Sequence, residues 1–214
     1  MTVTEALETR CSIRAFLSTP VEQEKIAAIF EKAARTPSWA NSQPWEAFVA
    51  TGETLEKIKQ GYADCYKNSV PAAPEVPRPV SWPKECVSRR EQLLSDMKRD
   101  CGDAAAQFGA LNKTMFGAPA VIYLCMDKTL TEWSMYDVGA YSQSLMLAAA
   151  EEGLGTIPAM TLALYPEILR RELAIPDDLK ITIGIALGYS DGQNGINRFK
   201  SARLLTEQTV HIAF

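Results

Sequence analysis

The stretch RTPSWANSQPWEAFVATG, residues 35–52, follows a helical pattern and leads directly into a strand-like one, WEAFVAT at 45–51. Pro37 and Pro44 interrupt regular structure at the two ends of its polar part. Between them lie carboxamide and hydroxyl groups and a large indole, all of which hydrogen-bond or stack. An ordinary polar loop is one interpretation, and one wall of a ligand-binding cleft is the other. The rest of the chain has to decide between them.

Two helices are expected before this stretch. Thr2 and Glu5 fit a capping box for the first. For the second, Thr19 fits the N-cap, Pro20 the first helical position and Glu22 the closing acidic residue. Apolar residues then repeat at spacings of three and four, which predicts a helix with one buried face.

The pattern after the stretch predicts two more strands and a long helix. PAVIYLCM at 119–126 is apolar throughout, as in a strand buried on both faces, and KITIGIALGY at 180–189 is typical of a third core strand. The almost wholly apolar run 134–152, with Ser134 and Asp137 as its cap pair, predicts a central buried helix. Helices and strands alternate along the chain, so the fold class is α+β around one sheet.

Composition narrows the possible chemistry. The 214 residues are 47% hydrophobic and carry a net charge of −4, which gives no overall attraction to nucleic acid. The five scattered cysteines form no CxxC pair and are expected to be reduced thiols in a cytoplasmic protein, and no signal or membrane-spanning segment is expected. His211 is the only histidine, which leaves little room for a histidine-based triad or metal site. If the protein is an enzyme, a cofactor is expected to carry the chemistry.

Residues 63–112 break this regular order. Five prolines fall between positions 71 and 83, too densely for a helix or a central strand. A surface excursion or linker is the simple interpretation. Because Tyr62, Tyr66 and Trp82 are costly to leave in solvent, a lid that packs over something is favoured.

Two basic clusters lie near opposite ends of the chain. Arg10, Ser12 and Arg14 alternate, which in an extended segment places all three side chains on one face. Arg198, Lys200 and Arg203 follow a turn near the C-terminus. Each cluster alone reads as solvated surface, but the two together could meet on one anion such as a phosphate.

The segment GTIPAMT, 155–161, is a third candidate. It reads either as a tight helix-to-strand turn or as a set of backbone donors for a cofactor, since Ala159, Met160 and Thr161 have no evident secondary-structure partners. The glycine pair in EEGLGT follows a helix and lacks a third glycine, so it is not a dinucleotide-binding fingerprint.

Five motifs then stand in order along nearly the whole chain: RCSIR (10–14), PSWANSQPW (37–45), FGAPAVIYL (116–124), DVG (137–139) opening a helix that runs to AAAEEGLGT, and NRFKSAR (197–203). In this set the chain resembles the FMN-dependent nitroreductase superfamily. The resemblance implies a single FMN-binding domain over 1–214, an α/β/α sandwich with a central, mainly antiparallel sheet and a Pro-rich lid or insert at about 63–112. It also implies a domain-swapped homodimer with FMN at the subunit interface and a C-terminal arm, TEQTVHIAF, wrapping the partner.

The resemblance assigns roles to the candidate residues. Arg10, Lys200 and Arg203 would hold the FMN phosphate with Ser12 nearby, and Arg14 would lie at the N1/O2 edge of the flavin. The polar loop would approach from the partner subunit, Pro158 would lie against the ring, and the Met160 N–H would point at flavin N5. The implied cofactor-binding set is Arg10, Cys11, Ser12, Arg14, Ser38, Trp39, Asn41, Gln43, Pro158, Ala159, Met160, Thr161, Lys200 and Arg203, with no metal ligand and no catalytic acid or base.

The implied reaction is a ping-pong transfer from NAD(P)H to a nitroaromatic or quinone. Trp39 departs from the family pattern, which has a small residue there in many relatives, so the indole could narrow the cleft or stack on a substrate. The alternatives are a reductive dehalogenase or another specialised flavoenzyme of the same fold, such as the flavin-consuming synthase of the cobalamin lower ligand, and a non-catalytic flavin-binding protein.

Overall fold

A computed structural model describes residues 1–213 of the chain, and Phe214, the last residue of the expected domain and arm, lies outside the described residues. Its centre is a four-stranded sheet in the order β1-β2-β4-β3. The strands are β1 (Glu46–Thr51), β2 (Ala120–Asp127), β3 (Gly155–Ala159) and β4 (Leu179–Gly188). All three neighbouring pairs are antiparallel, which confirms the expected α+β fold with a mainly antiparallel sheet.

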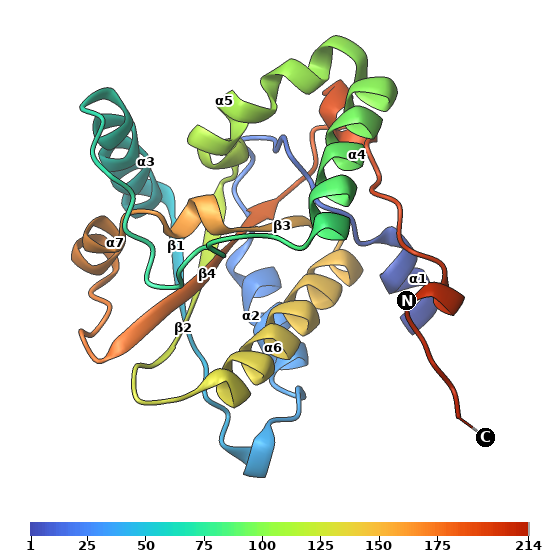
Figure 1. Cartoon of the computed structure of the whole chain (residues 1–214). Coiled ribbons are helices and arrows are strands. Elements are labelled where there is room, and N and C mark those ends of the chain that lie inside the picture. The colour runs from blue at the N-terminus through green and yellow to red at the C-terminus, as the bar shows by residue number, and fades with distance from the viewer. Residues whose placement is uncertain (214) are drawn as a thin grey trace.

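Helices cover both faces of this sheet (Figure 1). They are α1 (Val3–Thr9), α2 (Gln23–Ala33), α3 (Gly52–Lys67), α4 (Lys84–Cys101), α5 (Phe108–Lys113), α6 (Glu132–Glu151) and α7 (Pro166–Leu173). Short 3-10 turns are η1 (Trp39–Asn41), η2 (Gly102–Gln107), η3 (Met115–Gly117), η4 (Met160–Ala163), η5 (Gly195–Arg198) and η6 (Thr206–Gln208). Within the described chain, no helix combines the length and apolar character needed to cross a membrane.

Strand β2 shows why two layers of helices form. Its alternate residues point to opposite faces, so an apolar strand needs a core on each side. Tyr123 joins a core with residues of α3 and α7, whereas Ile122 joins a second core with residues of α2 and α6. The expected α/β/α sandwich therefore follows from a strand that is apolar at every position except the last.

Two predicted helix starts are wrong by a few residues. Helix α2 has Glu22 as its N-cap rather than Thr19, because the Glu22 carboxylate accepts a hydrogen bond from the Tyr189 hydroxyl at 2.7 Å and its backbone stays extended. Helix α6 begins after Thr131 rather than at Ser134. Asp137, expected as a cap partner, instead accepts the backbone N–H of Trp39 at 3.1 Å.

Strand β3 was expected as a turn or an unpaired donor segment. Residues 155–159 instead pair with β4, from Gly155 opposite Gly188 to Ala159 opposite Gly184. Pro158 is tolerated because β3 is an edge strand, and five residues with a glycine and a proline carry no strand signal in the sequence. The N-terminal segment runs beside its other edge, where the Ile13 N–H donates to the Thr156 carbonyl at 3.0 Å.

Residues 63–112 comprise the end of α3, an extended segment at 68–83, α4, η2 and α5. Tyr62 is buried and its hydroxyl donates to the Leu162 carbonyl at 2.6 Å, whereas Trp82 is about half exposed. Helix α4 packs through the buried Met97 against Ile196 and Phe199, so this part of the chain is fixed to the C-terminal region. Its role as a lid stays a prediction.

Candidate active site

The two basic clusters lie together although they come from opposite ends of the chain. They line one cavity of about 200 Å³. The candidate residues on its wall are Arg10, Cys11, Ser12, Arg14, Lys200 and Arg203. Four basic side chains against one acid, Glu8, suit this basic cavity to a phosphate, but Cys11 lines it beside Arg10 and Ser12, so strict alternation in RCSIR does not account for the shared wall.

Asn197 holds the two clusters in register. Its Oδ1 accepts the backbone N–H groups of Arg14 at 2.7 Å and Ala15 at 3.1 Å. Its Nδ2 donates to the carbonyls of Ala15 at 2.7 Å and Asp191 at 3.0 Å, and to the Ser190 hydroxyl at 3.3 Å. Three of these contacts join the C-terminal loop to residues 14–15, and the other two fix the amide within the loop. Sequence reasoning noted Asn197 only as part of a motif and missed this role.

Arg14 is the most buried charge in the basic cavity, with 7% of its surface exposed. Its Nη1 donates to the Ser12 carbonyl at 2.9 Å, and its guanidinium carbon lies 5.1 Å from the centre of the Phe199 ring. Burial lowers the pKa of Arg14, but an arginine stays charged under these conditions.

The Nε of Arg14 is buried and has no hydrogen-bond partner among the described residues. An unmet buried donor costs about 1–3 kcal/mol, a cost that a bound acceptor would remove. The residues present therefore fit an anionic, acceptor-rich ligand such as FMN.

The polar loop at 37–44 faces a different place. Ser38 and Trp39 line a separate cavity of about 570 Å³ together with Trp133 and Tyr136 of α6, and Asn41 and Gln43 line neither this cavity nor the basic one. Trp39 is 69% exposed, with its ring centre 6.4 Å from that of Trp133. Tyr136 was missed because the predicted helix 134–152 was expected to be buried on nearly every side, and Trp133 was missed because it lies before the predicted start of that helix.

The backbone of this loop is held in an uncommon conformation. Ala40, Asn41 and Gln43 all have φ near +50°, in the left-handed region. Such residues cost about 1–3 kcal/mol each and persist where surrounding contacts fix them. Here the Ser38 hydroxyl accepts a hydrogen bond from the Gln43 N–H at 2.9 Å, and the Asp137 carboxylate accepts one from the Trp39 N–H. The loop is therefore built to present Trp39 outward.

The 158–161 segment lies apart from the basic cavity's lining as well. Pro158 and Ala159 end β3, and Met160 and Thr161 begin η4. The Thr161 hydroxyl hydrogen-bonds to Asn112 Oδ1 at 3.1 Å. Met160 lines a third cavity, of about 490 Å³, beneath the 68–83 segment; we call it the segment cavity.

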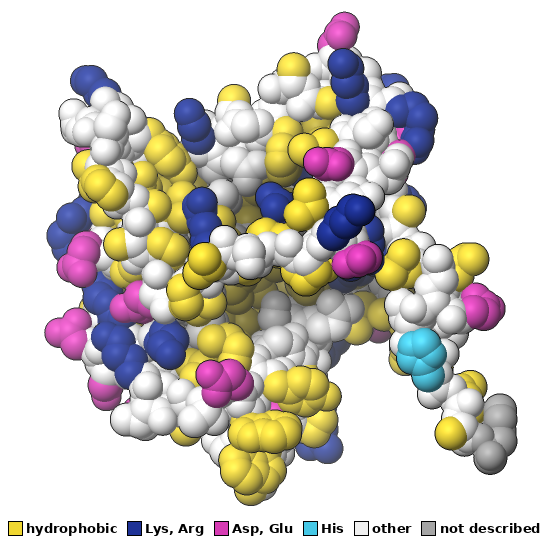
Figure 2. Space-filling view, in the orientation of Figure 1, with side chains coloured by type: hydrophobic (Ala, Val, Ile, Leu, Met, Phe, Trp, Pro, Cys, Tyr) yellow, Lys and Arg dark blue, Asp and Glu magenta, His cyan; other side chains and the backbone are white. Residues whose placement is uncertain are grey.

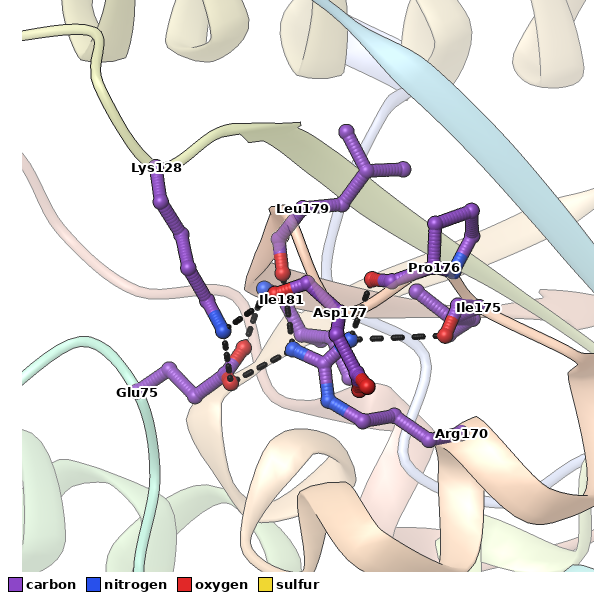
Figure 3. A network of polar contacts seen from close by, with 8 residues as sticks. All are labelled: Glu75, Lys128, Arg170, Ile175, Pro176, Asp177, Leu179 and Ile181. Atoms are coloured by element: carbon purple, nitrogen blue, oxygen red, sulfur yellow. Dashed lines mark hydrogen bonds and ion pairs between the residues drawn. The ribbon is translucent and has the colours of Figure 1, made fainter.

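Glu75 fixes the 68–83 segment to the start of β4 (Figure 3). Its carboxylate accepts from Arg170 Nη2 and from the Ile181 N–H, both at 2.6 Å, and Lys128 Nζ lies 3.8 Å away. Arg170 also donates to three backbone carbonyls, those of Ile175, Pro176 and Leu179. The segment is therefore held by an ion pair that is mostly withdrawn from solvent. Nothing in the sequence indicated this partner for Glu75.

The Nitroreductase family model matches residues 7–189 of the chain. The chain belongs to the nitroreductase family. Over 208 residues it is 30% identical to a 4-nitrobenzoate reductase of Pseudomonas putida, covering 94% of this chain and 91% of the relative.

Solved nitroreductase structures share the whole fold. The FMN- and NADPH-dependent nitroreductase NfnB of sphigopyxis sp. strain HMH superimposes with a TM-score of 0.92 at 30% identity, covering 100% of both chains. The FMN-dependent NfnB of Mycobacterium smegmatis, solved in complex with NADPH, gives a TM-score of 0.89 at 25% identity, again over 100% of both chains.

Proposed function

We propose that this protein is an FMN-dependent NAD(P)H oxidoreductase that reduces nitroaromatics or quinones by a ping-pong mechanism. The observation that carries the proposal is the basic cavity, in which Arg10 and Arg203 from opposite ends of the chain line one wall and Arg14 keeps an unmet donor. The names of the relatives support the choice of cofactor and acceptor.

In this proposal Arg10, Lys200 and Arg203 hold the FMN phosphate, with Ser12 and Cys11 beside it. Guanidinium groups bind phosphate through paired, charge-assisted hydrogen bonds, which Lys200 supplements as a point charge. Arg14 supplies a fixed positive charge for the N1/O2 edge of the flavin, where negative charge develops during reduction.

Bound FMN would supply the two-electron acceptor and donor that the side chains lack. The chain's own contribution is positioning: Pro158 and Ala159 form a wall for the ring, and the backbone N–H groups of Met160 and Thr161 are donors near it. With both reactants held in one place, a bimolecular transfer becomes an effectively unimolecular one.

A second copy of the chain would complete the site. Ser38, Trp39, Asn41 and Gln43 lie away from the basic cavity of their own chain, which supports their approaching the flavin of a partner in a domain-swapped homodimer. Residues 204–213 are exposed and include Leu205 and Ile212, two apolar side chains that a partner could cover.

The proposal includes a single FMN-binding domain over residues 1–214, in which residues 63–112 form a lid or insert. A cytoplasmic location is supported by the five free cysteines.

The deciding experiment is an anaerobic visible spectrum of the purified protein, before and after NADPH and then after nitrobenzene. The expected result is a yellow flavin spectrum that bleaches with NADPH and returns with the acceptor. A colourless protein that FMN cannot reconstitute would overturn the proposal. A flavin that bleaches but is not reoxidised by any nitroarene or quinone would favour a non-catalytic flavin-binding protein.

A further inference from the structure

The segment cavity beneath residues 68–83 is large enough for a small aromatic molecule. Its volume of about 490 Å³ lies within the range of about 300–1,000 Å³ that is usual for small-molecule sites. Prolines and aliphatic residues make up most of its wall, and Trp82 offers an aromatic face. On the side drawn in Figure 2, basic side chains stand around a hollow that is largely lined by apolar ones.

Besides the Trp82 indole, three polar side chains line the segment cavity: Arg78, Arg90 and Thr182. The Thr182 hydroxyl is already committed, because it donates to the Leu124 carbonyl at 2.8 Å. The two arginines are therefore the polar side chains with donors to spare.

Neither arginine forms an ion pair within the described residues. Arg78 makes one contact, from Nε to the Met160 sulfur at 3.2 Å, and sulfur is a weak acceptor. Arg90 lies over the Trp82 ring with its guanidinium carbon 4.9 Å from the ring centre. The nearest acid along the segment, Glu75, is bound to Arg170 instead. The segment cavity thus combines an apolar slot, one indole and two unneutralised guanidinium groups.

We propose that the segment cavity binds an aromatic acceptor that carries an anionic group, a nitroarene carboxylate or its equivalent, and that Arg78 and Arg90 select for that anion. Arginine pairs with carboxylate through two parallel hydrogen bonds, and the indole and prolines suit the flat ring. The inference rests on the proposed function, of which it specifies the acceptor.

Met160 connects this cavity to the proposed cofactor site. Its side chain lines the segment cavity, whereas its backbone N–H is the donor assigned to the flavin. An acceptor in the cavity would therefore lie beside the residue that flanks the ring, with its anionic group held by the arginines of the segment.

Binding can be tested without turnover. Benzoate and its neutral analogue benzamide are titrated by calorimetry into the oxidised, FMN-loaded protein and into the R78Q and R90Q variants. Each substitution is expected to lower the ratio of benzoate to benzamide affinity about tenfold, which corresponds to 1.4 kcal/mol. R89Q is the matched control, because Arg89 is an exposed neighbour on α4 that contacts Cys86 and lines none of the cavities described above. An unchanged ratio in both variants, or an equal change in R89Q, would overturn the inference.

Kinetics separate this inference from its rival and from the proposed function. With 4-nitrobenzoate and nitrobenzene as acceptors, R78Q and R90Q are expected to lower the ratio of the two kcat/KM values by about the same tenfold. If the KM for NADPH rises while the ratio of the kcat/KM values for the two acceptors is unchanged, the arginines bind the phosphates of NADPH and the inference is wrong. If neither nitroarenes nor quinones are reduced but benzoate binding still depends on both arginines, the proposed function fails and the anion site stands.

Discussion

Two side chains each tie distant parts of this nitroreductase together, and they do so by different physics. Asn197, a neutral amide, joins the N-terminal arginine segment to the C-terminal loop through three hydrogen bonds, and two more fix it within the loop. Glu75 joins the Pro-rich segment to β4 and α7 through an ion pair with Arg170 and one backbone N–H. The first tie shapes the proposed cofactor cavity and the second shapes the wall of the segment cavity.

The difference indicates which side of the site is free to vary. A neutral amide satisfied on every side is insensitive to salt and expensive to break, because its removal leaves buried backbone groups unpaired. An ion pair with about a tenth to a fifth of each side chain exposed is screened by salt much less than a surface pair, but it depends on the charge of both partners. We therefore expect the proposed cofactor cavity to tolerate fewer changes than the wall of the segment cavity.

The largest effect is expected for N197A. It leaves the backbone N–H groups of Arg14 and Ala15 without their acceptor, which should lower the free energy of unfolding by about 2–4 kcal/mol. Denaturant unfolding of the apoprotein measures this. Q193A, at an exposed position in the same loop, should be close to neutral. Equal stability of the two variants would show that Asn197 is not a structural tie.

The next effect concerns the cofactor rather than the fold. R203A should raise the FMN dissociation constant about 10- to 100-fold, the loss of one or two charge-assisted hydrogen bonds, with little change in unfolding. Fluorescence titration of FMN into apoprotein measures it. R198A removes an exposed arginine that does not line the basic cavity and should bind FMN normally. An unchanged FMN affinity in R203A would contradict the phosphate assignment.

A smaller effect is expected for E75Q, which keeps an amide oxygen but removes the charge that Arg170 faces. The expected loss is about 1–2 kcal/mol of stability, intermediate between exposed and buried ion pairs. The KM for the acceptor should rise while FMN affinity stays constant, because the substitution loosens only the segment wall. E85Q, exposed at the start of α4, is the control. If FMN affinity fell instead, the two sides of the site would not be separable.

The smallest effect on stability belongs to W39S. Since Trp39 is 69% exposed, its loss should change the free energy of unfolding by less than about 0.5 kcal/mol. Its effect should appear in the relative kcat/KM values across a panel of nitroarenes and quinones, with FMN content largely intact. If the variant and the wild-type protein had the same relative kcat/KM values, Trp39 would not line the proposed shared cleft.

The sequence predicted best where the signal was local. Arg10, Ser12 and Arg14 line one cavity as predicted, although Cys11 lines it too and strict alternation is not seen. The apolar run of β2 gave the two-sided sheet, because that pattern depends only on strand geometry. The helix starts at Thr19 and Ser134 were wrong because Glu22 and Asp137 have partners far along the chain, Tyr189 and Trp39.

The wall of the segment cavity was not predictable from the sequence, because it also depends on partners far apart along the chain. Glu75 and Arg170 are 95 residues apart and stand in unremarkable contexts, so only the folded chain shows that they meet. Tyr136 fell within the helix expected to be buried, because a helix with little polar character gives no sign of which face stays open, and Trp133 fell before its predicted start.

The hydrogen bonds between Arg14 and Asn197 also limit when, during synthesis of the chain, the basic cavity can form. A ribosome that adds about 5–20 residues per second makes Arg203 about 10–40 s after Arg10. Until then the first basic segment has neither its amide clamp nor its partner cations, so a nascent chain has no formed pocket for the cofactor. If the basic cavity holds the FMN phosphate as proposed, flavin binding is expected only late in synthesis or after it, once the polypeptide has reached a nearly complete fold.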